Sequence, residues 1–162
     1  MFTLNKRRDQ RGFTIVELLI VIVVIGILAA LVVTTYGGIQ AKGRDSQRQA
    51  DLSALQTQVE AFYANNNYYP ALADVNDDDW RAANMKSLDD GAMKDPSAAE
   101  NSDSLSATAA SATNQKIYGY VTTGCTGTAP DDDTGSTDQC TGYTLTAYLE
   151  AAEKVEEKRA LD

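Results

Sequence analysis

A single apolar run near the N-terminus limits what this chain can fold into. Residues 13–36 number twenty-four, and residues 18–33 contain no polar side chain. As a helix the run would extend about 36 Å, which exceeds the roughly 30 Å of hydrocarbon in a bilayer. Its one charge is Glu17, and an unpaired carboxylate in hydrocarbon costs on the order of 3 kcal/mol. The run therefore predicts a transmembrane helix whose carboxylate needs a partner.

A cut between Gly12 and Phe13 would supply that partner. The new α-amino group of Phe13 would be positively charged and could pair with Glu17 in a neighbouring copy of the helix. The residues from Gly12 onward, Gly-Phe-Thr-Ile-Val-Glu-Leu-Leu, follow a short basic leader. They closely resemble the prepilin processing motif of type IV pilins and pseudopilins. The resemblance implies cleavage after Gly12 by a prepilin peptidase, N-methylation of Phe13 and a role for Glu17 in assembly.

The resemblance also implies a function. It indicates a structural subunit that is inserted in the membrane and polymerises through its N-terminal helix into a type IV pilus-like filament. Its partners would be copies of itself, other pilins, the membrane, a polytopic assembly platform protein and a cytoplasmic assembly ATPase. The alternative is a pseudopilin of a type II secretion or competence system, which would form a short fibre. Adhesion, twitching motility, secretion and DNA uptake are all open as the filament's role.

Three other interpretations are less favoured. A secretory signal peptide would be cut near Ala29 and Ala30, but its apolar region is usually shorter, and a glutamate at its start would serve no purpose. A plain signal anchor would let Glu17 snorkel to the interface. A membrane-anchored enzymatic or binding head has little chemistry to use, since the chain has no histidine and no glycine-rich phosphate loop. We therefore expect no enzyme activity.

Charge favours one orientation and argues against one class of partner. Residues 1–12 carry four basic side chains and one acidic one. This leader favours a cytoplasmic N-terminus, although Lys42, Arg44 and Arg48 beyond the run weaken the contrast. We expect a single-pass membrane precursor and then a filament at the cell surface. The chain has a net charge of −9, so loss of the +3 leader leaves −12, which argues against direct nucleic-acid binding.

The helix should continue past the membrane. Residues 40–65 contain no proline and carry a narrower apolar stripe at helical spacing. Its members are Leu52, Leu55, Val59 and Phe62. We expect one helix over residues 13–65, with residues 37–69 as an amphipathic half that ends near Tyr69 and Pro70.

Glycines are the weak points of this predicted helix, because each lowers helix stability by about 1 kcal/mol relative to alanine. Gly37 and Gly38 are adjacent, and Gly26 matches a glycine common in the family that the chain resembles. Many members have a proline eight residues later, where this chain has Thr34. Two roles for Gly26 stay open, namely unwinding of the following turn in a filament and close helix packing.

We expect residues 70–116 to form a variable surface connection. Asp79 is expected to cap a short helix over residues 80–88, with Gly91 as its stop. Residues 97–114 consist mostly of alanine, serine and threonine, which predicts a mobile surface loop. Glycosylation of its hydroxyl groups is a less favoured alternative.

Residues 117–122 and 143–149 are the strand candidates, because they are rich in aromatic and β-branched side chains. They should pair antiparallel. One face of the second strand should meet the helix stripe, and it consists of Tyr143, Leu145, Ala147 and Leu149. Residues 150–162 are helix-prone and highly charged, which predicts an exposed tail or terminal helix. The expected fold class is α+β, with a long N-terminal helix packed against a small antiparallel sheet within residues 117–149.

Cys125 and Cys140 bracket the loop between these strands. The absence of histidine and of a C-x-x-C motif argues against a zinc site. A disulfide would contribute roughly 3 kcal/mol and require an oxidising, extracytoplasmic setting. The loop holds Asp131, Asp132, Asp133 and Asp138, which could bind Ca²⁺ as some pseudopilins do in their C-terminal loop. No EF-hand spacing is present, so a solvated acidic loop is favoured and no cofactor is expected.

Overall fold

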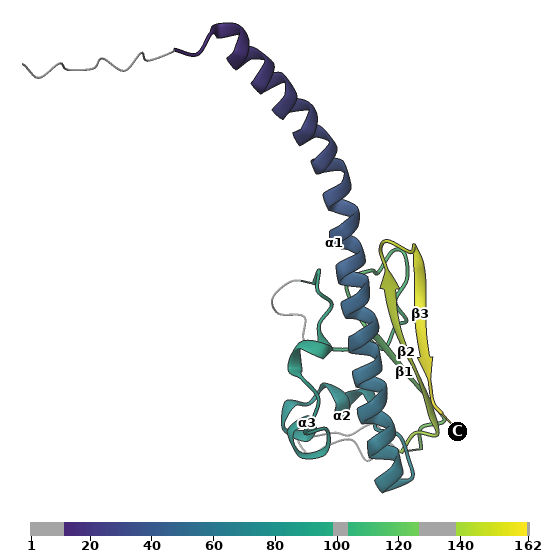
Figure 1. The fold of residues 1–162 in the computed structure, drawn as a ribbon. Coiled ribbons are helices and arrows are strands. Elements are labelled where there is room, and N and C mark those ends of the chain that lie inside the picture. The colour runs from purple at the N-terminus through teal and green to yellow at the C-terminus, as the bar shows by residue number, and fades with distance from the viewer. Residues whose placement is uncertain (1–11, 99–103, 127–138, 162) are drawn as a thin grey trace, which may run out of the picture. The chain divides into compact units, whose positions relative to one another are not determined.

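The computed structural model describes residues 12–98, 104–126 and 139–161 (Figure 1). The chain divides into two compact units, residues 1–39 and 40–162. The described part of the first unit consists of residues 12–14 and the N-terminal portion of the long helix α1 (Ile15–Asn66). The second unit, here called the head, contains the rest of α1, two short α-helices, a 3-10 turn and a three-stranded sheet.

The portion of α1 in the head is held by the apolar stripe that the sequence predicts. Leu52, Leu55 and Val59 are fully buried and Phe62 is 5% exposed. The helix ends at Asn66, and Asn67 then adopts a φ of 64°, a left-handed conformation that asparagine tolerates better than most residues. The predicted long helix is therefore confirmed, and its observed end lies one residue beyond the predicted one.

The sheet packs on this face of α1. Its strands β1 (Gly119–Thr123), β2 (Gly142–Leu149) and β3 (Lys154–Arg159) are antiparallel in the order β1-β2-β3. The face of β2 that meets the helix stripe is buried as expected, and it consists of Tyr143, Leu145, Ala147 and Leu149. The predicted α+β class is confirmed, with a sheet of three strands instead of the two expected.

The third strand corrects the prediction for the C-terminal residues. Residues 150–162 were expected to form a tail or helix, but Lys154–Arg159 form β3. Its residues pair with β2 from Leu149↔Lys154 to Thr144↔Arg159. Lysine, glutamate and arginine favour a helix only by tenths of a kcal/mol per residue, and here pairing along the whole strand outweighs that preference.

The connection between α1 and the sheet is more ordered than predicted. It contains α2 (Leu72–Asn76), α3 (Asp78–Asn84) and the 3-10 helix η1 (Asp90–Met93). The predicted helix over residues 80–88 is misplaced. Asp77, and not Asp79, caps it, because the Asp77 Oδ1 accepts the Trp80 N–H at 2.6 Å. Gly91 lies inside η1 and is not the stop of α3.

Part of the predicted mobile loop over residues 97–114 closes the outer edge of β1. The Ser106 N–H donates to the Tyr118 carbonyl at 2.9 Å, and the Tyr120 N–H donates to the Ser106 carbonyl at 2.8 Å. Leu105 and Ala110 are buried, so the expectation of a mobile surface loop is wrong for this part. Two buried apolar side chains suffice here because the loop's backbone, not its side chains, pairs with β1.

Candidate assembly site

The side chains of Thr14 and Glu17 cap the N-terminus of α1. The Thr14 N–H and Oγ1 both donate to the Glu17 Oε2, at 2.8 and 2.7 Å. In return, the Glu17 N–H donates to the Thr14 Oγ1 at 3.2 Å. This reciprocal arrangement is a capping box, which satisfies backbone donors that have no partner within the helix. The carboxylate is also favoured there by the positive end of the helix dipole.

The capping box provides hydrogen bonds to the Glu17 carboxylate but does not neutralise its negative charge. Thr14 supplies only neutral donors, and both reach the same oxygen, Oε2. Among the residues that the structure describes, no donor reaches Oε1 and no cation contacts the carboxylate. The negative charge and one carboxylate oxygen therefore remain accessible to a cation from outside the described residues.

Thr14 is the residue that the sequence reasoning missed. Glu17 was treated as a lone charge that needs a partner from another copy, whereas its first partner lies three residues earlier in the same chain. The signal was present as T-x-x-E immediately before an apolar run, which is typical of a capping box.

The helix behind this site presents an uncovered apolar surface. Phe13 is 81% exposed and Ile15 is 84% exposed. The large apolar side chains that follow are also exposed, namely Val16, Leu18, Leu19, Ile20, Val21, Ile22, Val23, Val24, Ile25, Ile27, Leu28, Leu31, Val32, Val33, Tyr36 and Ile39. By length and composition, α1 could cross a membrane. So large an apolar surface requires lipid or other protein to cover it.

Gly26 lies within this surface. A Cβ added at Gly26 would meet no atom within 4 Å. Nothing in the described unit therefore requires a glycine, and both roles considered for it remain predictions about the filament.

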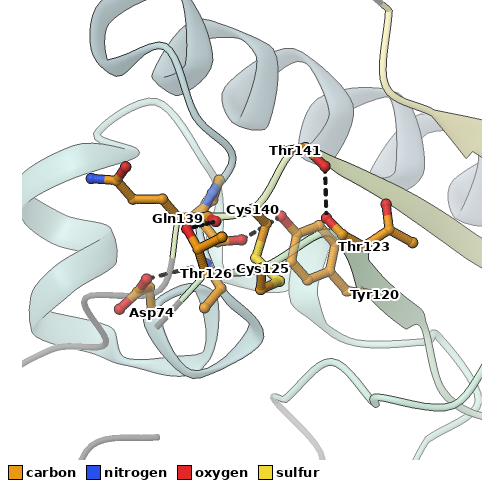
Figure 2. The surroundings of a disulfide bond; sticks show 10 residues. Asp74, Tyr120, Thr123, Cys125, Thr126, Gln139, Cys140 and Thr141 are labelled. Carbon is orange, nitrogen blue, oxygen red and sulfur yellow. Dashed lines mark hydrogen bonds between the residues drawn. A yellow bond between two sulfur atoms is a disulfide. The ribbon is translucent and has the colours of Figure 1, made fainter. Parts of the chain in front are cut away.

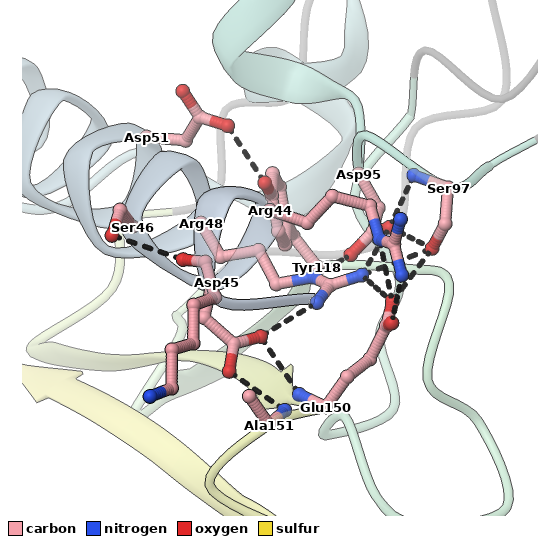
Figure 3. Close-up of polar contacts among 11 residues, drawn as sticks. Arg44, Asp45, Ser46, Arg48, Asp51, Asp95, Ser97, Tyr118, Glu150 and Ala151 are labelled. Atoms are coloured by element: carbon pink, nitrogen blue, oxygen red, sulfur yellow. Dashed lines mark hydrogen bonds and ion pairs between the residues drawn. The ribbon is translucent and has the colours of Figure 1, made fainter. Parts of the chain in front are cut away.

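A buried arginine, Arg48, forms hydrogen bonds to three segments of the head (Figure 3). The Arg48 side chain is fully buried. Its Nε donates to the Asp95 Oδ2 at 2.6 Å, and its Nη1 donates to the Asp45 Oδ1 at 2.9 Å. Its Nη2 reaches the Glu150 Oε1 at 2.5 Å and the Ser97 Oγ at 2.9 Å. One guanidinium thus joins α1 to the segment after η1 and to the turn between β2 and β3. We call Arg44, Arg48, Asp45, Asp95 and Glu150 the arginine cluster.

The cluster stabilises the charged forms of its carboxylates. Hydrogen bonds from Arg44 and Arg48, opposed by burial, lower the pKa of Glu150 to about 2. For Asp95, burial raises the pKa, but the hydrogen bonds from Arg48 and Ser97 outweigh it, so the pKa is lowered overall. The Asp45 carboxylate also accepts the backbone N–H of Glu150 at 2.7 Å. From the sequence, Arg48 was interpreted only as a charge beyond the apolar run, although it lies four residues before Leu52 on the buried stripe.

The predicted disulfide between Cys125 and Cys140 is present (Figure 2). Cys140 is buried, and its backbone exchanges two hydrogen bonds with Tyr69, at 2.9 and 3.1 Å. Cys125 follows β1, and the adjacent Thr126 N–H donates to the Gln139 carbonyl at 3.0 Å. The bridge therefore ties the ends of β1 and β2 to the segment that follows α1.

The acidic residues proposed for calcium lie outside the described residues, and they are Asp131, Asp132, Asp133 and Asp138. Among the described residues, no group of three or more histidine, cysteine or acidic side chains is placed to hold a metal ion. Calcium binding therefore stays a prediction about the loop.

The matches to known proteins each cover less than half of the chain. Residues 7–33 match the family model described as the prokaryotic N-terminal methylation motif. The type II secretion system core protein G of Dickeya chrysanthemi is 40% identical over 63 residues, which is 39% of this chain and 41% of that protein. The same-named protein of Escherichia coli is 39% identical over 61 residues, 38% of this chain and 42% of that protein.

A pilin is similar to about the same degree. The type IV major pilin protein PilA of Myxococcus xanthus is 38% identical over 64 residues, which is 40% of this chain and 29% of that protein. The chain thus spans less than half the length of these relatives. No solved structure matches the chain. The chain thus carries the prokaryotic N-terminal methylation motif and, over about 40% of its length, is similar both to a type II secretion system core protein and to a type IV pilin.

Proposed function

We propose that this chain is a non-catalytic subunit of a type IV pilus-like filament. It is stored in the membrane as a single-pass precursor with its N-terminus in the cytoplasm. A prepilin peptidase cleaves it after Gly12, Phe13 is methylated, and the subunit polymerises at the cell surface through α1. A platform protein, an assembly ATPase and other pilins are the partners that this function requires.

The observation that carries this proposal is the single carboxylate at the start of an exposed apolar helix. Lipid can cover the apolar side chains as well as another protein can, so these side chains alone do not require polymerisation. Glu17 distinguishes lipid from a protein neighbour. Its negative charge and its accessible carboxylate oxygen are unfavourable in hydrocarbon, but they can bind a cation supplied by another subunit. After cleavage, the α-amino group of Phe13 in an adjoining subunit is such a cation.

The test separates membrane insertion from assembly. Glu17→Leu removes the charge from the apolar run, so the variant should remain in the membrane fraction at wild-type level or above. In a filament, however, it leaves the incoming amine buried without a counter-charge, which costs about 3–5 kcal/mol. We therefore expect loss of the chain from sheared surface fibres, as measured by quantitative immunoblot of both fractions.

Glu17→Gln is the matched control. It retains a side-chain acceptor for the Thr14 hydroxyl and for an amine but carries no charge, so its fibre yield should fall between those of the wild type and Glu17→Leu. Wild-type fibre yield from Glu17→Leu would overturn the pairing and leave Glu17 with only its capping role.

A pseudopilin function is the second candidate, and one observation favours it. The relatives from Dickeya and Escherichia are both named as type II secretion system core protein G. A pseudopilin would use the same anchor and the same Glu17 contact in a short fibre. Deletion of the gene separates the two, because loss of long surface fibres indicates a pilin, whereas retained fibres with loss of protein secretion indicate a pseudopilin.

A further inference from the structure

A groove lies at the end of the head where α1 enters it. Its volume is about 420 Å³, and it lies between the first residues of the head part of α1 and the turn that joins β2 to β3. Lys42 of α1 and Lys154 of β3 both line it. We propose that this groove binds the phosphate of a phospholipid headgroup and so holds the head against the bilayer while the subunit is stored in the membrane.

The turn between β2 and β3 is fixed beside this end of α1. The Asp45 carboxylate accepts the backbone N–H groups of Glu150 and Ala151, at 2.7 and 2.8 Å (Figure 3). It also accepts a hydrogen bond from Arg48, so its negative charge is compensated within the arginine cluster. The other lining side chains are polar or small and apolar, which suits the phosphate and the glycerol of a headgroup, and they are Ser46, Gln49, Leu149, Ala151 and Ala152.

The two lysines are available to an anion. Lys42 is exposed, and it forms no ion pair with any residue that the structure describes. Lys154 lies 3.4 Å from Glu156 with its side chain 58% exposed, and so exposed a pair contributes little stability. Glu153 is exposed in the turn but does not line the groove. The groove therefore presents two cations to a phosphate.

The length of chain between the apolar run and the groove brings the groove within reach of lipid headgroups. A membrane-spanning helix needs about 20 residues, so a span that begins at Phe13 ends close to Val33. Lys42 follows nine residues later in the same helix, which is about 14 Å of helix. The headgroup layer covers roughly 5–8 Å of that distance, and a lysine side chain that snorkels toward the interface spans most of the remainder.

A lipid is a better occupant of the groove than a second copy of the chain. Two copies that each carry a net charge of −9 repel one another, whereas a cation near an anionic membrane surface is attracted to it. The inference rests on the membrane storage that the proposed function includes, but it does not require polymerisation. Absence of the chain from surface fibres would therefore refute the proposed filament and leave the lipid site intact.

Native mass spectrometry of the full chain in a neutral detergent tests the phosphate site. The probes are phosphatidylglycerol and a diacylglycerol with the same acyl chains but no phosphate. Attraction to the membrane surface is about five-fold per lysine, so Lys42→Gln/Lys154→Gln should weaken phosphatidylglycerol binding by about 25-fold and leave diacylglycerol binding unchanged. The matched control, Lys86→Gln/Lys116→Gln, removes two exposed lysines elsewhere in the head and should bind both probes as the wild type does.

Three results would overturn this assignment. Equal phosphatidylglycerol binding by the wild type and Lys42→Gln/Lys154→Gln would show that the lysines do not hold the phosphate. An equal loss of diacylglycerol binding would show that the contact is with the acyl chains. Displacement of phosphatidylglycerol by an equal concentration of inorganic phosphate would assign the groove to a free anion.

Amide hydrogen exchange in phosphatidylglycerol nanodiscs tests the site in a bilayer. Amides of residues 151–154 should exchange more slowly in the wild type than in Lys42→Gln/Lys154→Gln, in discs that hold one copy of the chain. The control variant Lys86→Gln/Lys116→Gln should match the wild type. Protection that arises only in discs with two copies would identify a second chain as the occupant and overturn the lipid site.

Discussion

Removal of the Arg48 side chain should severely destabilise the head. The Arg48 and Asp95 side chains are both fully buried and joined by two hydrogen bonds. Arg48→Ala therefore leaves Asp95 as a buried carboxylate without a counter-charge, a change that typically costs about 3–5 kcal/mol. Glu150 adds less, because its side chain is 21% exposed and it keeps Arg44. Domains of this size are stable by only about 5–15 kcal/mol, so the expected loss is a large fraction of the total.

Urea unfolding of the full chain in detergent measures this loss. The fluorescence of Trp80, the chain's only tryptophan, reports on the head. The control is Arg44→Ala, because Arg44 is 33% exposed and its ion pair is with Glu150, so its loss should destabilise the head far less than the loss of Arg48. The double variant Arg48→Met/Asp95→Leu removes both charges and should recover most of the stability.

Two outcomes would refute this reasoning. A loss below about 1 kcal/mol for Arg48→Ala would show that Asp95 finds water or another partner when the guanidinium is removed. A double variant as unstable as Arg48→Ala would show that the charged pair itself is not what the single variant disrupts.

Three further predictions concern the head. Reduction of the disulfide, or Cys125→Ser, should lower the free energy of unfolding by about 3 kcal/mol in the same urea assay. Gly119→Ala should lower the free energy of unfolding of the head by about 1–3 kcal/mol, because the new Cβ would lie 2.7 Å from the Thr108 carbonyl oxygen and against the Thr146 hydroxyl. The control is Gly43→Ala, because the new Cβ at that position would meet no atom within 4 Å. The pKa of Glu150 is about 2 against an ordinary value of 4.5, so its contribution should be complete above pH 4.5 and lost as the pH falls to 2, as measured by unfolding at graded pH.

Features that depend on one segment were predictable from the sequence. The long helix and its stripe from Leu52 to Phe62 follow from the spacing of apolar residues, which decides a helix's buried face. The alternation in β2 likewise indicated which of its faces packs on α1. The resemblance around Gly12 was carried by consecutive residues, so no tertiary information was needed.

Features that depend on distant partners were not predictable in this way. β3 has a helix-prone sequence and becomes a strand because β2 offers it a partner along its full length. In the sequence Arg48 resembles a surface charge, because its partners Asp95 and Glu150 are far away in the chain and only the fold brings them into contact with it. The loop around Ser106 has little apolar content and is ordered by backbone bonds to β1. Thr14 was different, since its capping signal is local and was overlooked.

The most direct test of the central claim is the mass of the N-terminal peptide from sheared surface fibres. If the chain is a processed filament subunit, this peptide begins at Phe13 and carries one extra methyl group on its α-amino nitrogen. A surface form that retains residues 1–12, or one cut near Ala30, would contradict the account, because neither provides the free Phe13 amine that the proposed pairing with Glu17 requires.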